Sequence, residues 1–217
     1  MGAWAVEWER RFILAIVNGY ASLSEVKAAA RITDTIDDAL LELSIEASSR
    51  EIDGICERVF YSSGTATRVY IPTDIFLLET DDIVSVTTIK SDTTGEGGFN
   101  QTWADSDYQL EPLNGLAGGI VTPATRVRAV GDYLWPIYEP RDITAGQASV
   151  QIVGVFGFAA VPIAIKQATI LMALRQFKRY DSPLGAAGFG DLGVMRVSRY
   201  DPDVEALIGP WKKLRMA

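Results

Sequence analysis

Carboxylates are the side chains of this sequence best placed to do acid–base or metal chemistry. One cluster, at residues 201–205, contains Asp201 directly before Pro202, the usual order of an N-cap residue and the first residue of a helix. No closing Glu follows at the spacing of a calcium-binding EF-hand loop. We therefore predict that these carboxylates begin helices or form turns rather than hold a metal. The other two clusters are Asp37-Asp38, expected at a helix start, and Asp81-Asp82, expected in a turn.

Other catalytic groups are scarce. The chain has no histidine and one cysteine, Cys56, which excludes Ser-His-Asp and Cys-His catalysis, His-containing zinc sites and thiolate clusters. Cys56 lies in a helical pattern and is expected to be buried as a small apolar residue. The glycines of residues 185–193 lack the Gly-Lys-Ser/Thr of a phosphate-binding loop and follow a helix, so a mobile loop is expected there. The sequence predicts no catalytic, cofactor or metal site, and hence no enzyme.

The composition is that of a folded globular protein with an acidic surface. Of 217 residues 48% are hydrophobic and 22% are charged, and the net charge is −8. This charge disfavours nonspecific attraction to nucleic acid or to an anionic membrane. The apolar run at residues 12–17 is too short to span a bilayer, so Trp4 to Val17 is expected to form a short amphipathic helix or an arm. We expect a cytoplasmic protein that lets DNA pass without gripping it.

The first part of the chain has two helical patterns. Ser22 and Glu25 have the spacing of a capping box, which predicts a helix over residues 22–30. A second helix is expected to begin near Thr35, with Asp38 in the same relation. This second helix has two apolar stripes, which indicates either two partners, one of them another copy of the chain, or deep burial within its own domain. The stripes are Ile36, Leu40, Leu43 and Ala47, and Ile45, Ile52, Cys56 and Val59.

A block of β-rich sequence follows and then helix returns. Strand-length runs rich in β-branched residues, separated by Gly, Pro and Asp turns, predict a small antiparallel sheet, sandwich or partial barrel. The fold class is therefore α+β: a helical core with an inserted antiparallel β-domain and a C-terminal arm or helix. The expected strands include residues 67–71, 83–89, 108–110, 126–130 and 149–155. The expected divisions are residues 1–62, 65–158 and 161–217, the last with a glycine-rich loop at 182–197.

The C-terminal part should contain a long helix after Pro162 and a short one from Pro202 to about Ile208, which Gly209-Pro210 would end. Cations near the end of the long helix complement its C-terminus, and the net charge disfavours a DNA groove there. Two interpretations of the last segment stay open. It is an arm that becomes ordered on binding a partner, or it packs back on its own core.

Three segments resemble the head-tail connector (adaptor) family of long-tailed bacteriophages. They are residues 20–61 with Leu23-Ser24-Glu25-Val26-Lys27, residues 107–112 with Asp107-Tyr108-Gln109-Leu110-Glu111-Pro112, and residues 182–204 with Gly188-Phe189-Gly190-Asp191-Leu192-Gly193. The resemblance lies in the order and spacing of these segments, since none of them is a chemical fingerprint. The β-block is larger than a minimal connector needs.

This resemblance implies a structural protein of the virion neck, assembled in the host cytoplasm and without a membrane. Its subunits would form a ring, a dodecamer of about twelve copies, beneath the portal protein, and each subunit would present two different complementary faces. A head-closure or tail-completion protein would bind the ring, and DNA would slide through an acidic channel without specific binding. The residues expected at the portal interface are Leu184, Phe189, Leu192, Val194, Val204, Leu207, Trp211, Lys212 and Lys213.

Other functions fit parts of the same pattern. A different neck protein, such as a tail terminator or head-closure factor, would share the acidity and the oligomeric state. A carboxylate-based hydrolase or a carbohydrate-binding β-module is a further alternative. Tyr108, Tyr133, Trp135 and Tyr138 could form an aromatic platform for a sugar, although aromatic residues beside prolines more often close a core.

Overall fold

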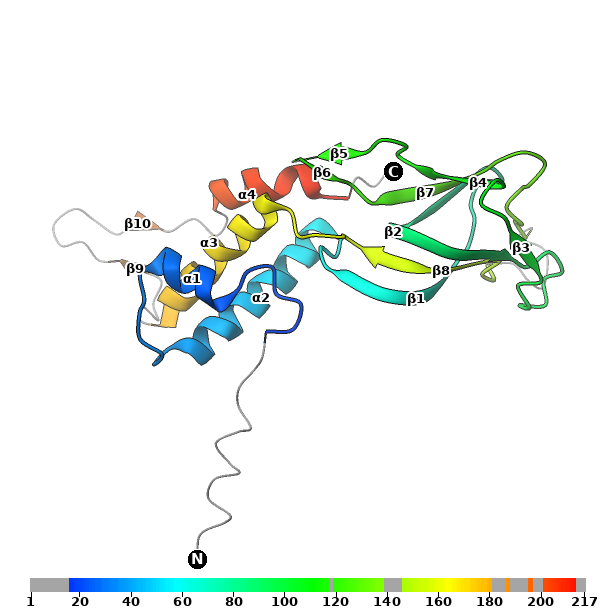
Figure 1. Ribbon diagram of the computed structural model, residues 1–217. Coiled ribbons are helices and arrows are strands. Elements are labelled where there is room, and N and C mark those ends of the chain that lie inside the picture. The colour runs from blue at the N-terminus through cyan, green and yellow to red at the C-terminus, as the bar shows by residue number, and fades with distance from the viewer. Residues whose placement is uncertain are drawn as a thin grey trace, which may run out of the picture. The chain divides into compact units, whose positions relative to one another are not determined.

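The computed structural model describes residues 16–117, 119–138, 146–180, 186–187, 195–196 and 201–213. The chain divides into two compact units, a helical unit (residues 1–57 and 161–217) and a β unit (residues 58–160). Helices and an antiparallel sheet make up these units (Figure 1), so the predicted α+β class is confirmed. The segment expected as an N-terminal helix or arm lies largely outside the described residues.

The helical unit contains α1 (Leu23–Ala30), α2 (Asp38–Cys56), α3 (Ile163–Tyr180), α4 (Pro202–Ile208) and the short 3-10 helix η3 (Gly209–Trp211). The described residues also include a short antiparallel pair, β9 (Ala186–Ala187) with β10 (Met195–Arg196). Asp201 caps α4 by accepting a hydrogen bond from the backbone N–H of Asp203, and Pro202 begins that helix. The expected short C-terminal helix is therefore confirmed.

The capping box predicted for the first helix is present. The Ser22 Oγ accepts from the Glu25 N–H at 3.2 Å, and the Glu25 Oε2 accepts from the Ser22 N–H at 2.8 Å. The Glu25 carboxylate also pairs with Lys166 Nζ of α3 at 2.8 Å. Glu25 thus begins α1 and attaches it to α3.

The predicted start of α2 was wrong. The helix begins at Asp38 rather than near Thr35, and its N-cap Asp37 makes no side-chain capping bond. The Asp34 side chain accepts a hydrogen bond from the Ile36 N–H at 3.1 Å in a local turn. Asp38 forms an ion pair with Lys27 Nζ at 2.5 Å and does not complete a capping box. An ion pair to α1 thus replaces the local cap that the spacing suggested.

The core of the helical unit lies where α1, α2 and α3 meet. Val26 of α1, Leu41 and Ile45 of α2 and Ala173 of α3 are all fully buried in one cluster. The whole β unit separates α1 and α2 from α3 in the chain, so the packing of α3 on the first two helices closes a long loop. Helices α2 and α3 form the largest contact in this unit and run side by side (Figure 1).

The β unit is built on a six-stranded antiparallel sheet with the strand order β1-β8-β2-β7-β4, in which β3 also pairs with β2. A separate two-stranded ribbon joins β5 to β6. The expected strands are confirmed, whereas the three short strands β3, β5 and β6 were not predicted. The strands are β1 (Ser62–Tyr70), β2 (Leu77–Ser91), β3 (Gln101–Trp103), β4 (Tyr108–Glu111), β5 (Leu116–Ala117), β6 (Ile120–Val121), β7 (Ala124–Ala129) and β8 (Val150–Gly157).

The turn predicted at Asp81-Asp82 was wrong, because β2 continues through both residues. The pairing register with β7 shifts between Glu79 and Ile83, so the acidic residues occupy an irregular stretch of a long strand. Asp82 is nearly buried and accepts two hydrogen bonds from the Arg58 guanidinium, at 3.0 and 2.5 Å. The same guanidinium lies 5.0 Å from the centre of the Phe158 ring. A buried ion pair, rather than a turn, explains the cluster.

Breaking this pair should destabilise the β unit. Asp82→Ala leaves the Arg58 charge buried without its carboxylate, and we expect the free energy of unfolding to fall by about 3 kcal/mol. The matched control is Asp81→Ala, whose ion pair with Arg68 is solvent-exposed and is expected to contribute less than about 1 kcal/mol. Urea titrations of both variants measure the difference. Equal losses would contradict the assigned role of Asp82.

The attachment of α1 to α3 should depend on pH. The hydrogen bond from Lys166, together with those from Ser22, lowers the pKa of Glu25 to about 2 from an ordinary value of 4.5. A depressed carboxyl pKa stabilises the fold above the unfolded pKa, and this contribution is lost as the pH falls toward the folded pKa. We expect Glu25→Gln to be less stable than the wild type at neutral pH by up to about 1 kcal/mol.

This stability difference should shrink to nothing as the pH falls from about 5 to 2. Urea titrations across that pH range are the measurement. A difference that stays constant with pH would show that the amide has removed packing rather than charge.

Candidate functional site

The aromatic residues proposed as a sugar platform belong to the core of the β unit. Trp135 is 1% exposed and stacks on Trp103, with ring centroids 4.0 Å apart. Tyr133 packs against Trp103 at 5.0 Å, and the Tyr138 hydroxyl donates to the backbone carbonyl of Asp92 at 2.7 Å. Tyr108 donates to Asp105 at the surface. These side chains do not form an open platform, so the closed-core alternative is the one observed.

Within the described residues, no group of three or more Cys, Asp or Glu side chains is arranged to hold a metal ion. No helix in that part of the chain is long and apolar enough to cross a membrane. Cys56 is fully buried, with its Sγ 4.0 Å from the Ile208 carbonyl oxygen, as its position in the helical pattern predicted.

One of the two apolar stripes predicted for α2 is buried and the other is exposed. Ile45, Ile52 and Cys56 are fully buried in the helical unit. Val59, predicted to continue this stripe, lies beyond the end of the helix, because Glu57 adopts a left-handed conformation with φ 53° and ends α2. The other stripe faces outward. We call it the outer α2 stripe, and it consists of Ile36, Leu40, Leu43 and Ala47.

The outer α2 stripe is an unusual surface for a helix in a globular unit. Ile36 is 87% exposed, and Leu40 and Leu43 are 37% and 39% exposed. Leu40, Leu43 and Ala47 are 3 and 4 positions apart along α2, the spacing at which one helix packs along another, and Ile36 lies in the turn just before the helix. An apolar stripe left in solvent marks an interaction site.

Helix α3 has a second outward surface of a different character. Its buried face contains Ile165, Ala168, Thr169 and Ala173, all without exposed area. The opposite side, which we call the outer α3 stripe, consists of the exposed residues Ile163, Gln167, Leu171 and Lys178. The α3 sequence contains four cations and no carboxylate, whereas α2 contains five carboxylates and one cation. The outer α3 stripe is thus mixed, with Ile163 and Leu171 beside Gln167 and Lys178, and the two helices have opposite net charge.

The residues predicted at the portal interface fall into three groups. Leu184, Phe189, Leu192 and Val194 lie outside the described residues. Val204 and Trp211 are 6% and 5% exposed and pack within the helical unit. Leu207 is half-buried, Lys212 pairs with Glu205, and the Lys213 N–H donates to the Cys56 carbonyl at 2.9 Å. Over residues 201–213 the chain therefore packs back on its own core, the second of the two interpretations.

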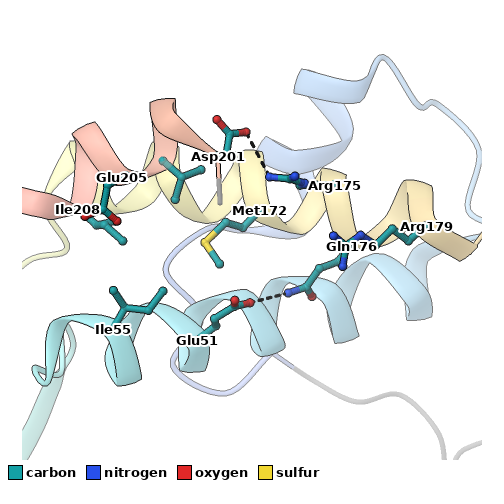
Figure 2. Close-up of a pocket in the computed structure, with 10 residues that line it drawn as sticks. Glu51, Ile55, Met172, Arg175, Gln176, Arg179, Asp201, Glu205 and Ile208 are labelled. Atoms are coloured by element: carbon teal, nitrogen blue, oxygen red, sulfur yellow. Dashed lines mark hydrogen bonds and ion pairs between the residues drawn. The ribbon is translucent and has the colours of Figure 1, made fainter. Parts of the chain in front are cut away.

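A shallow pocket lies among α2, α3 and α4, and charged side chains of both signs surround it (Figure 2). Arg175 lies 3.7 Å from Asp201, and Gln176 donates to Glu51 at 3.0 Å. Met172 and Ile55 form part of its apolar floor. These ion pairs and hydrogen bonds fasten α4 and α2 to α3. Four of the five charged groups that line the pocket have partners among the described residues, all except Arg179, and we interpret the pocket as a packing junction of the three helices.

The C-terminal helix should be part of the stable fold. Trp211→Ala removes a buried aromatic side chain, and we expect it to lower the free energy of unfolding by about 3–5 kcal/mol. Leu207→Ala, the matched control on the half-buried side of α4, should cost about 1 kcal/mol. Chemical denaturation followed by far-ultraviolet circular dichroism compares them. A Trp211 variant as stable as the wild type would favour the arm interpretation.

The matching family model describes the Phage gp6-like head-tail connector protein and covers residues 20–99. A chain in the neck of an empty GTA particle has a TM-score of 0.54 and 19% identity, covering 95% of this chain and 96% of that one. A chain in the virion of a native gene transfer agent (GTA) particle has a TM-score of 0.54, 21% identity and the same coverage, 95% and 96%. At these identities the likeness shows a shared fold.

No sequence among the curated proteins matches this chain. The family match includes α1, α2, β1 and β2, and thus the whole outer α2 stripe. The resemblance to head-tail connector proteins that the sequence predicted is therefore confirmed, and residues 20–99 are the part of the chain that matches the family.

Proposed function

We propose that this chain is a structural subunit of a virion neck, a head-tail connector that forms a ring beneath the portal protein and links the capsid to the tail. The observation that carries the proposal is the outer α2 stripe, an exposed apolar surface inside the segment that matches the connector family. In a monomer, exposing Ile36, Leu40 and Leu43 to water stabilises nothing. In an assembly, a neighbouring subunit covers these side chains, and their burial stabilises the contact.

Ring formation makes a specific demand on each subunit. A closed ring needs head-to-tail contacts, in which two different surfaces of the same chain are complementary. The outer stripes of α2 and α3 differ in residue type and in surrounding charge, which supports this arrangement. We expect a ring of about twelve copies.

The net charge supports a channel that conducts DNA. A chain with a net charge of −8 offers few unpaired cations to DNA phosphates, so the affinity for duplex DNA should be low at physiological salt. An acidic wall repels phosphates and lets DNA slide past. The chain would act in the virion neck after assembly in the host cytoplasm, as a structural protein and not as an enzyme.

The proposed partners are the portal protein on one side and a head-closure or tail-completion protein on the other. The residues that we retain for the portal contact are Leu184, Phe189, Leu192, Val194, Leu207, Lys212 and Lys213. Val204 and Trp211, being buried, would hold α4 in place rather than touch the partner themselves.

Deleting the gene from the phage or phage-like particle that encodes it tests this function. We expect DNA-filled heads and tails of normal length that fail to join, because the link between them is missing. Electron microscopy of the lysate shows these products, and expression of the wild-type chain from a plasmid is the control that restores joined particles.

Other outcomes identify the alternatives. Tails of uncontrolled length would indicate a tail terminator, and heads that lose their DNA would indicate a head-closure protein. Normal particles would contradict any essential role in the neck.

A further inference from the structure

The two outer stripes lie on opposite sides of the helical unit. Helices α2 and α3 turn their buried faces toward the same core, which contains Leu41 and Ile45 from α2 and Ala173 from α3. Each outer stripe lies about half a helical turn from the buried face of its own helix. The two stripes therefore point away from each other. This is the geometry that a head-to-tail contact between copies requires.

Lys178 and Arg179, at the end of α3, make no ion pair within the part of the chain that the structure describes, whereas Lys166 and Arg175 already pair with Glu25 and Asp201. On α2 the carboxylate nearest to the outer stripe is Glu51, which accepts a hydrogen bond from Gln176. Helix α2 as a whole is acidic and α3 is basic, so the two helices are complementary in net charge.

Charge also decides between kinds of self-association. If α2 packed on α2 of another copy, two acidic helices with five carboxylates and one cation each would meet, and α3 on α3 would bring together two helices with four cations and no carboxylate each. A contact between α2 and α3 of different copies brings oppositely charged helices together and covers the apolar residues of both stripes.

We propose that the outer α2 stripe of one subunit docks on the outer α3 stripe of the next copy of this chain. This inference rests on the proposed function, because it names the surfaces through which the ring closes. Leu43, in the second turn of α2, and Leu171, near the middle of α3, are exposed residues of the two stripes and would lie at this contact.

Cysteine cross-linking in assembled particles tests the contact. Particles are made without the wild-type chain, in two forms. One form contains a mixture of the Leu43→Cys chain and the Leu171→Cys chain, and the other contains a single chain with both substitutions. The native Cys56 is fully buried and stays in place, so the unmutated chain is the background control. After mild oxidation, particles that contain both single variants should give a covalent dimer, and the doubly substituted chain should give a ladder of higher oligomers. Ala29→Cys, exposed on α1 and outside both stripes, replaces Leu171→Cys as the matched control and should give no dimer with Leu43→Cys.

Each outcome decides a different point. Dimers formed by Leu43→Cys alone would overturn the proposal in favour of two-fold α2–α2 packing. Joined particles that contain the chain but show no cross-link would overturn the proposal and leave the neck function standing. Purified particles that lack the chain would overturn the neck function itself.

A charge-reversal variant tests the electrostatic part of the contact. The double substitution Lys178→Glu and Arg179→Glu, made together with the cysteine pair, places carboxylates opposite α2, and we expect the cross-link yield to fall by about tenfold or more. An unchanged yield would contradict the electrostatic part of the proposal. Circular dichroism of the purified chain confirms that the variant is folded.

Discussion

The packing of α2 on α3 is the contact on which the helical unit depends. Leu41 and Ile45 reach a core that they share with Ala173, although the entire β unit lies between these helices in the sequence. The entropy of closing such a long loop grows only slowly with its length, so a modest apolar core can hold the insertion. Ser44 and Ser49 lie on the same buried face and donate their hydroxyl protons to the carbonyls of Leu40 and Ile45, so these polar groups are satisfied within α2.

This packing also determines what remains for other molecules. Once one face of each helix is buried, the outer α2 stripe and the outer α3 stripe are left exposed on opposite sides. Helix α4 and the 3-10 helix η3 cover a further part of the unit through Val204 and Ile208 of α4 and Trp211 of η3, which are all nearly buried. The surface available for assembly is thus the part that the packing of these helices leaves uncovered. Its apolar part on α2 lies within the segment that matches the connector family.

The sequence predicted the elements whose cause is local. The Ser22–Glu25 capping box, the Asp201-Pro202 helix start and the β-branched runs each contain their own determinant, and all are present. The errors arose where a distant partner decides the local structure: Asp38 pairs with Lys27 and not with its own helix start, and Asp82 pairs with Arg58 inside a strand. The short strands β3, β5 and β6 are two or three residues long, too short for a periodic pattern to appear. Two apolar stripes on α2 were recognised, but only the fold could show that Ile45 faces the core and Leu43 faces solvent.

An electron cryomicroscopy reconstruction of the neck of the intact particle would show whether the chain forms a ring through these surfaces. We expect density for this chain in a closed ring around the DNA channel, with α2 of each subunit beside α3 of its neighbour and Ile36, Leu40 and Leu43 excluded from solvent. A neck that does not contain the chain, or a ring in which the outer α2 stripe faces the solvent or the channel, would contradict it.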